Sequence, residues 1–292
     1  MMLVGTPFTS SSMLSLPASA GIGLRSPHLK QVLADQPKVE WFEVHSENYF
    51  VSGGPALTTL EAIRQHYPIS LHGVGMSLGS AKNIDLAHLK NLKMLVNRIQ
   101  PASISEHLCW SSVNGRWLND LLPLPYSNEA LDKVCLHVDQ VQEALGQTIL
   151  VENVSSYLRF LPEEMPEWIF VAEVARRTGC RILLDVNNIY VSACNHNYKA
   201  DEFITNIPIG TVAEIHLAGH EEVDGLLIDT HSRPIRTEVW DLYKTALQRF
   251  GPTPTLIEWD QDIPELDVLL AEANKAQRYI TSVVEHTNAV TI

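Results

Sequence analysis

The chain is short of basic residues, with 21 Lys and Arg against 34 Asp and Glu and a formal net charge of −13. Proteins that bind nucleic acids obtain most of their affinity from contacts between Lys or Arg and phosphates. The charge balance therefore argues against a DNA or RNA partner. An acidic surface is more often a solvated surface than a site for a cationic partner, so the charge alone names no partner.

Cysteines and long apolar segments are also scarce. The four cysteines are widely spaced and form no CxxC pair, which argues against a zinc knuckle or a disulfide framework and favours a reducing, cytoplasmic location. No segment approaches the roughly 20 apolar residues that span a bilayer, so we expect no membrane partner. Residues 1–20 include an apolar patch without a preceding basic region, and we expect a flexible lead-in rather than a signal peptide.

Short, nearly continuous apolar runs recur along the rest of the chain. Amphipathic segments with helical spacing lie between most of them, a pattern that predicts βαβ units with parallel strands. Eight runs are expected to be strands, at residues 21–24, 39–45, 69–72, 102–106, 148–153, 181–185, 212–217 and 255–259. Helices are expected at residues 55–66, 87–99, 128–145, 168–178 and 237–250, and glycines follow the last three.

Eight alternating units predict an α/β fold of the (β/α)8 TIM-barrel type. Such a barrel needs roughly 250 residues, and a single domain over residues 21–292 provides them. The alternative is an open doubly wound sheet, which usually carries a glycine-rich GxGxxG turn after its first strand. No such turn follows residues 21–24, so the barrel is favoured.

The carboxyl ends of the predicted strands are unusually polar. Active sites of TIM barrels lie at these ends, so the residues that close each run are candidate functional residues. A single histidine there is more often a hydrogen-bonded rim residue, but carboxylates gathered at one mouth repel unless cations or protons neutralise them. Seven consecutive predicted strands end in a metal-ligand type, namely His45, His72, Glu106, Asn153, Asp185, His216 and Glu258.

Three loop residues extend this candidate metal site. Asn188 follows the sixth strand, and Asp229 and His231 form an Asp-x-His pair in the seventh loop, where side chains at i and i+2 of an extended segment point the same way. Ten groups exceed the needs of one ion and suit two or three. Their nitrogen and oxygen donors suit iron, manganese or zinc, which the sequence does not distinguish.

Four further polar residues lie near these candidates. Glu47, His220 and Asp260 are sequence neighbours of ligand candidates, and we interpret them as residues that orient the ligands through hydrogen bonds. His196 lies in the sixth loop, where it could join the site or serve only as a hydrogen-bonding loop residue.

Eight motifs occur in order along nearly the whole chain, from about residue 21 to residue 280: FEVHSENYF, SLHGVGMSLGS, SEHLCWS, LVENVSSYLRF, LLDVNNIYVSACNH, EIHLAGH, LIDTHS and TLIEWD. Together they resemble the multinuclear non-heme iron-dependent oxidative enzymes, the family that includes the catalytic subunit of methanobactin biosynthesis. The match is most similar to the bufferin-type branch, which is associated with small copper-binding, cysteine-containing peptides.

The resemblance implies a xylose-isomerase-like barrel enzyme with two or three iron ions in mixed Fe2+ and Fe3+ states. It implies that O2 oxidises cysteine residues of a ribosomally made precursor peptide, giving heterocycles such as thiooxazole, or oxazolone with thioamide. A partner protein that recognises the leader of the peptide is also implied. The family's ligands would fall on the ten candidates except Asn188, where the methanobactin branch has a histidine, so binding of a third iron depends on this amide.

Two other classes of protein remain open from the residues. One is a metal-dependent barrel isomerase or an endonuclease IV-like hydrolase, although the acidic charge and the absence of a lysine at any predicted strand end speak against these. The other is a non-catalytic metal-binding protein with saturated coordination. Oxygen uptake with a cysteine-containing peptide would distinguish an oxidase from the non-catalytic protein, which would turn nothing over.

Overall fold

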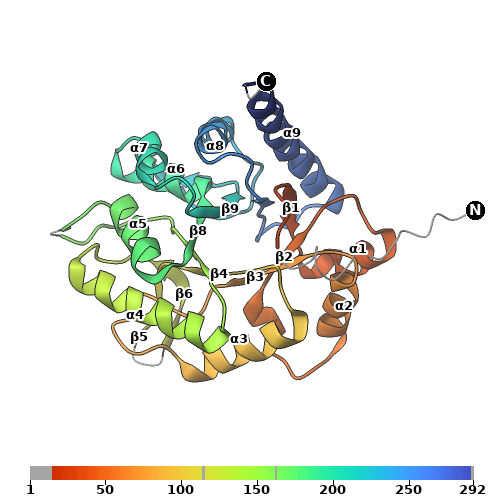
Figure 1. The fold of residues 1–292 in the computed structure, drawn as a ribbon, viewed down its shortest axis with the longest axis horizontal. Helices are drawn as coiled ribbons and strands as arrows, with labels where there is room; N and C mark the ends of the chain where they lie inside the picture. Colours follow the sequence, from red (N-terminus) through yellow and green to blue (C-terminus); the bar gives the residue numbers. More distant parts are fainter. Residues whose placement is uncertain (1–14, 114–115, 162, 291–292) are drawn as a thin grey trace, which may run out of the picture.

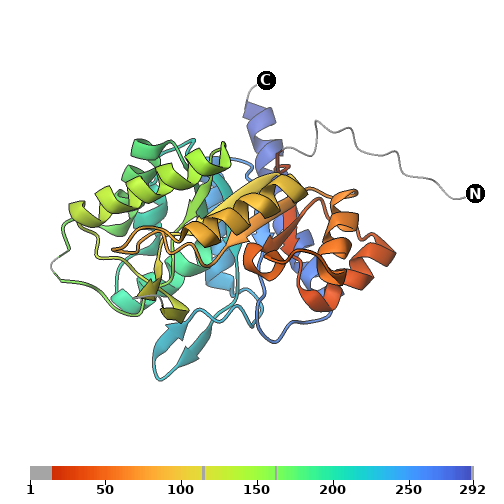
Figure 2. The same ribbon diagram turned by 90° about the horizontal axis from the view of Figure 1, so that it is seen from below.

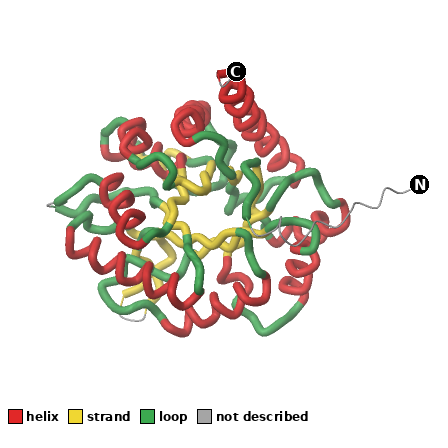
Figure 3. The backbone as a smooth tube through the Cα atoms, viewed as in Figure 1, coloured by secondary structure: helices red, strands yellow, loops and turns green. Residues whose placement is uncertain are grey.

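A closed barrel of eight parallel strands forms the centre of the molecule, which is described here from a computed structural model covering residues 15–113, 116–161 and 163–290. The strands form a ring around the barrel axis, with the helices outside it (Figures 1 and 3). β1 pairs with β12 and closes the ring, which confirms the predicted TIM barrel. The strands are β1 (Ala20–Gly23), β2 (Phe42–His45), β3 (Ile69–Gly73), β4 (Ser103–His107), β7 (Leu150–Glu152), β8 (Arg181–Asp185), β9 (Val212–Leu217) and β12 (Thr255–Ile257).

The five predicted helices are present, with ends within two residues of those expected. Several further helices were not predicted, and no described helix is long and apolar enough to cross a membrane. The helices are α1 (Leu29–Asp35), α2 (Pro55–Arg64), α3 (Leu86–Ile99), α4 (Asn128–Leu145), α5 (Glu167–Thr178), α6 (Val186–His196), α7 (Ala200–Asn206), α8 (Thr237–Phe250) and α9 (Leu266–Val290), with the 3-10 helices η2 (Ser26–His28) and η3 (Ser46–Tyr49).

Local sequence explains where α4 begins and ends. The side chain of Ser127 accepts a hydrogen bond from the Ala130 backbone N–H, which satisfies one of the free donors in the first turn. Gly146 then ends the helix in the left-handed conformation at φ 71°, which costs glycine little because it has no Cβ. Gly179 ends α5 with the same φ, as the sequence predicts.

Some predicted strands extend beyond the observed ladder. The runs at 39–45, 148–153 and 255–259 correspond to the shorter β2, β7 and β12, because the apolar residues at their ends are buried without ladder pairing. The predicted lead-in, residues 1–20, lies mostly outside the described residues. Within the described part, the backbone oxygen of Ser19 accepts hydrogen bonds from the Trp41 indole and the Thr255 backbone N–H.

Two β-hairpins that were not predicted lie in the loops after β4 and β9. They are formed by β5 (Trp110–Val113) with β6 (Arg116–Leu122), and by β10 (Glu221–Val223) with β11 (Leu226–Ile228). Both hairpins lie on the same side of the barrel, the lower side in Figure 2. Since both follow the carboxyl ends of barrel strands, they extend the walls around that mouth.

The inward face of the barrel is polar toward this mouth. Glu43 and His45 of β2 pair in register with Ser70 and His72 of β3, so the four side chains point the same way. A TIM-barrel interior is usually filled with Val, Ile and Leu. The fold therefore directs charged and hydrogen-bonding groups into a space that apolar side chains normally occupy.

Candidate metal centre

Side chains from six barrel strands and the segments that follow them converge at the carboxyl-terminal mouth. A cavity of about 660 Å³ opens there, lined by residues at the ends of seven of the barrel strands and in the loops that follow them. Five of the ligand candidates line this cavity directly, namely His45, Asn188, Asp229, His231 and Glu258. Deeper groups are fully buried beneath it.

The first group of converging side chains is rich in imidazole. His72 Nε2 lies 3.3 Å from His107 Nε2, and both nitrogens are within 3.3 Å of Glu152 Oε2. The opposite ring nitrogens are occupied, since His107 Nδ1 donates to the Gly73 carbonyl at 2.9 Å and His72 Nδ1 contacts Ser105 Oγ at 2.7 Å. The bond to Gly73 leaves the Nε2 lone pair of His107 available for a ligand, and donation from His72 Nδ1 to Ser105 would leave that of His72 available as well.

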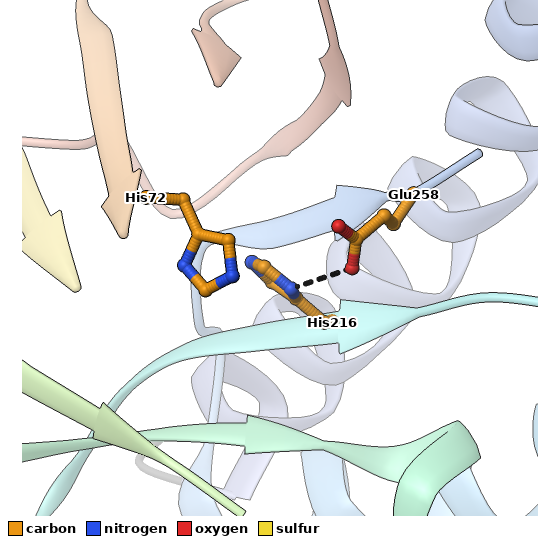
Figure 4. Close-up of side chains that lie close together, drawn as sticks. All are labelled: His72, His216 and Glu258. Atoms are coloured by element: carbon orange, nitrogen blue, oxygen red, sulfur yellow. Dashed lines mark hydrogen bonds and ion pairs between the residues drawn. The ribbon is translucent and has the colours of Figure 1, made fainter. Parts of the chain in front are cut away.

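The second group is rich in carboxylates. Single ligand atoms of Glu152, Asp185, His216 and Glu258 all lie within 4.8 Å of one another. His216 Nδ1 is 3.1 Å from Glu258 Oε2 and 3.7 Å from Glu152 Oε1. Figure 4 shows the His216 ring between His72 and Glu258, where the two groups adjoin. Because Glu152 belongs to both groups, it would help to hold an ion in either of them.

The carboxylates of this site are desolvated. Burial, together with the nearby Asp185 and Glu258, raises the pKa of Glu152 well above its usual range, although His216 opposes this. Burial and the charge of Asp229 raise the pKa of Asp185 to about 7. Asp185 Oδ2 has no hydrogen-bond partner among the described residues. A cation would remove the cost of burying these charges.

The imidazoles divide into two kinds. Burial and neighbouring imidazoles lower the pKa of His72 well below its usual range, and burial lowers the pKa of His107. Burial also acts to lower the pKa of His216, but the carboxylates of Glu43 and Glu258 outweigh it and raise that pKa. His72 and His107 are thus held neutral, the state in which an imidazole binds metal.

A third group lies at the rim, in the loop after β11. His231 Nε2 is 2.7 Å from Asp229 Oδ1, and its Nδ1 is 3.1 Å from Asp260 Oδ2. The Asp-x-His pair converges although His231 has a φ of 47° and not the extended backbone assumed from the spacing. Burial and the charge of Glu258 act to raise the pKa of Asp260, but Arg25 and His231 outweigh them and hold it at about 2.

His45 lies next to this rim group. Its Nε2 is 3.6 Å from Glu258 Oε1 and 3.7 Å from Asp260 Oδ1. Arg25 Nη2 also lies 3.1 Å from His45 Nε2, and Arg25 Nε donates to Asp260 Oδ1 at 2.8 Å. An ion bound by His45 would therefore compete with Arg25 for the same lone pair.

The two asparagines have different surroundings. Asn153 makes two hydrogen bonds with the backbone of Asp185, at 2.9 and 3.0 Å, and so ties the end of β7 to the end of β8. Asn188 Nδ2 donates to the Asn153 carbonyl at 3.1 Å, while its buried Oδ1 has no hydrogen-bond partner in the described chain. Asn153 is therefore engaged in structural hydrogen bonds, and Asn188 has an oxygen available to a ligand.

Glu106 lies apart from the two central groups. Its carboxylate accepts hydrogen bonds from the backbone of His107 and Met76, at 3.1 and 3.3 Å. A Cβ at Gly73 would lie 2.1 Å from Glu106 Oε2, so only glycine leaves room for this side chain. Adjacent strand residues point to opposite faces, which is why His107 meets Glu152 while Glu106 does not. His107 and Glu152 were not among the residues predicted from sequence.

The residues expected to orient ligands have clear contacts. His220 Nδ1 contacts Asn187 Oδ1 at 2.7 Å, and Asn187 Nδ2 donates to Asp229 at 2.7 Å. Glu47 accepts from the Val74 backbone N–H at 3.0 Å and lines the cavity. His196 lies elsewhere, 2.9 Å from Ser156 Oγ, and lines a separate cavity of about 310 Å³.

The donor set fits a metal centre. Neutral imidazole nitrogens and carboxylate oxygens converge, no thiolate takes part in the described groups, and Asp185 has a buried oxygen without a partner among the described residues. The two groups that share Glu152 suit two neighbouring ions, and the rim group with Asn188 could add a third. These ligand types suit iron, manganese and zinc alike.

Comparison with known proteins identifies close relatives. The family model described as RiPP precursor modification enzyme MbnB/TglH/ChrH matches residues 19–281. A UPF0276 protein of Acaryochloris marina is 51% identical over 261 residues, covering 89% of this chain and 94% of its own length. A UPF0276 protein of Chromobacterium violaceum is 50% identical over 266 residues, with coverages of 91% and 96%.

Solved structures with the same fold are far more distant in sequence. Endonuclease IV from Thermus thermophilus has a TM-score of 0.59 at 14% identity, with 90% of this chain and 99% of that chain covered. An L-ribulose 3-epimerase has a TM-score of 0.60 at 12% identity, with 96% of each chain covered. At these identities the likeness supports the xylose-isomerase-like barrel fold and nothing more.

Proposed function

Because the chain belongs to the MbnB/TglH/ChrH family of RiPP precursor modification enzymes, we propose that it is a multinuclear iron enzyme that uses O2 to oxidise cysteine residues of a ribosomally made precursor peptide. The substrate supplies the electrons and O2 accepts them. The products are heterocycles such as a thiooxazole, or an oxazolone with a thioamide.

The sharing of Glu152 between two ligand groups is the observation that carries this proposal. Glu152 Oε2 lies 3.2 Å from His72 Nε2, and Oε1 lies 3.7 Å from His216 Nδ1. A mononuclear site would not need ligands on both sides of one carboxylate. Iron held by these two groups would supply one-electron redox chemistry and sites for both a thiolate and O2.

The cavity above the centre suits a peptide thiol. Val74, Leu118 and Leu121 supply apolar parts of its wall, and the described lining includes no Lys or Arg that would attract a phosphate or a sugar acid. At the edge of this cavity, His88 Nε2 lies 3.2 Å from Glu47 Oε1. This pair is placed to take the proton that a cysteine thiol loses on binding.

Membership of the family implies a precursor peptide as substrate. We extend the proposal to a separate partner protein that binds the leader of that peptide and presents its cysteines to the mouth. Co-purification of the chain with candidate partners, with and without the peptide, tests this part separately.

Oxygen consumption by iron-loaded protein is the central test. The protein is purified anaerobically after iron-supplemented expression, its metal content and Mössbauer spectrum are measured, and O2 uptake is followed with a cysteine-containing precursor peptide and with its Cys→Ser variant. We expect two or three irons per chain and O2 uptake only with the cysteine peptide. Stoichiometric zinc without iron, or iron that supports no peptide-dependent O2 uptake, would exclude the oxidase and favour a hydrolase, an isomerase or a metal-storage protein.

A further inference from the structure

A second polar layer lies in the barrel beneath the candidate metal centre. This lower polar layer consists of Glu43 on β2, Ser70 on β3, Ser103 on β4 and Glu214 on β9. Glu43, Ser70 and Glu214 are 0% exposed. Two carboxylates at this depth are costly to bury, and branched aliphatic side chains usually fill the same space. Stability of the barrel therefore does not explain why they are there.

The layer makes a defined set of contacts. Ser70 Oγ donates to Glu43 at 3.0 Å, and Ser103 Oγ donates to Glu214 at 3.1 Å. His216 Nε2 faces both carboxylates, at 3.4 Å from Glu43 Oε2 and 3.5 Å from Glu214 Oε1. Glu43 reaches His216 across the interior of the barrel, because β2 and β9 are not neighbours in the sheet.

The two nitrogens of His216 consequently face two different environments. Nδ1 faces Glu258 and Glu152 in the candidate metal centre, and Nε2 faces Glu43 and Glu214 in the lower polar layer. A metal-binding imidazole commonly donates its other N–H to a carboxylate, which fixes the tautomer and raises the basicity of the ligand nitrogen.

We propose that Glu43 and Glu214 are positioning residues that accept the Nε2–H of His216 and thereby direct its Nδ1 lone pair to the metal. This inference rests on the proposed function only in requiring that the group of Glu152, Asp185, His216 and Glu258 holds a metal ion. The two carboxylates, at 3.4 and 3.5 Å from Nε2, restrain rotation of the ring. Negative charge below the imidazole also favours the more oxidised state of the bound ion.

Glu43→Gln and Glu214→Gln test the role of the two carboxylates with little change of shape. Anaerobic Fe2+ titration in competition with a chelator is expected to show 10- to 100-fold weaker binding of one ion, the order of loss typical of such partners. The reduction potential of that ion is expected to rise. Tyr243→Phe is the control. It removes another buried hydrogen bond, the 2.9 Å bond between the Tyr243 hydroxyl and Thr255 Oγ1 at the start of β12, and should leave both the affinity and the potential unchanged.

A His216→Ala background tests whether the carboxylates act through this histidine. In that background the two Gln substitutions should produce no further loss of affinity. If the loss persists there, or if affinity and potential are unchanged in the single variants, the inference is overturned while the proposed function stands. A wild-type chain that binds no ion would instead contradict the proposed function.

Nitrogen NMR of the wild-type chain provides a test that does not depend on the metal affinity of the two Gln variants. With 15N-labelled histidine and Zn2+ as a diamagnetic probe, the His216 signals, assigned by their loss in His216→Ala, should show a protonated Nε2 and a metal-bound Nδ1. A metal-bound Nε2 would overturn the assignment.

Discussion

The two halves of the barrel mouth differ in the chemistry of their side chains. Strands β2 to β4 present imidazoles, whereas β7 and β8 end in carboxylates, Glu258 follows β12, and His216 of β9 lies among these carboxylates. The pKa shifts in the two halves are opposite: burial lowers the pKa values of His72 and His107 and raises those of Glu152 and Asp185. Burial therefore favours the uncharged forms of these four groups, whereas Glu258 and His216 in the carboxylate half favour their charged forms, with the pKa of Glu258 lowered and that of His216 raised.

Despite this difference, both halves can contribute ligands to the same cations. Groups of one kind repel when they are charged, and His216 and His231 offset only part of the buried negative charge, since the pKa values of Glu152 and Asp185 stay raised. Neutral imidazoles on one side and carboxylates on the other satisfy a cation placed between them. Glu152 connects the halves, because it contacts His72 and His107 on one side and His216 on the other.

Removing the carboxylate of Glu152 is expected to have the largest effect on metal binding. Glu152→Gln should abolish stoichiometric binding in both groups, with at least about a 100-fold loss of affinity, since a ligand matters more than the residue that orients it. The metal-free variant should melt within about 4 °C of the metal-free wild type, because an amide replaces a carboxyl group whose pKa is raised. Elemental analysis and thermal melting with and without chelator measure both effects; full metal content in the variant would contradict the shared role.

Removing one ligand from each half should cost one ion each. His72→Ala is expected to lose the ion of the imidazole group, because the Nε2 of His72 lies close to His107 and Glu152. Asp185→Asn is expected to lose the ion of the carboxylate group. Metal content per chain should fall by about one in either variant, and Mössbauer spectra of the iron-loaded proteins should lose different components. Loss of the same component in both would show that the halves form a single site.

A smaller effect should separate the neighbours Glu106 and His107. We expect His107→Ala to weaken metal binding by about tenfold or more, since its Nε2 meets His72 and Glu152. Glu106→Gln should keep affinity within about threefold, because the carboxylate bonds to backbone N–H groups away from the centre. Chelator competition compares the two directly, and the reverse order would favour Glu106 as the ligand.

Acid should weaken the carboxylate half first. The pKa of Asp185 is about 7 without metal, so an ion must displace a proton there at lower pH. The contribution of Asp185 to affinity is therefore full above this pKa and is lost as the pH decreases through about 7, by about tenfold per pH unit for the proton displaced. His72 contributes no such loss near pH 7, because its pKa is lowered. Titrations from about pH 5.5 to about pH 8.5 should be flatter in Asp185→Asn than in His72→Ala.

Much of the site follows from short patterns in the strands. A polar residue, any residue and a histidine occur in succession as Glu43 to His45, Ser70 to His72, Ser105 to His107 and Glu214 to His216. Because alternate strand residues share a face, this spacing puts both polar groups of each strand inside the barrel. This pattern identifies His107, Glu43 and Glu214. A search limited to the last polar residue of each predicted strand misses them.

The sequence by itself determined the eight parallel strands, helices such as α4, α5 and α8, and the residue types at the mouth of the barrel. Hydrophobic periodicity and helix caps are local properties of the sequence. Only the tertiary structure decided that Glu152 belongs to both ligand groups, whereas Asn153 links the ends of β7 and β8. It also decided that one nitrogen of His216 faces the candidate metal centre and the other faces the lower polar layer. Those outcomes depend on strand register and on side chains that meet across the barrel, from residues as far apart in the sequence as Glu43 and Glu258, and no local pattern specifies such distances.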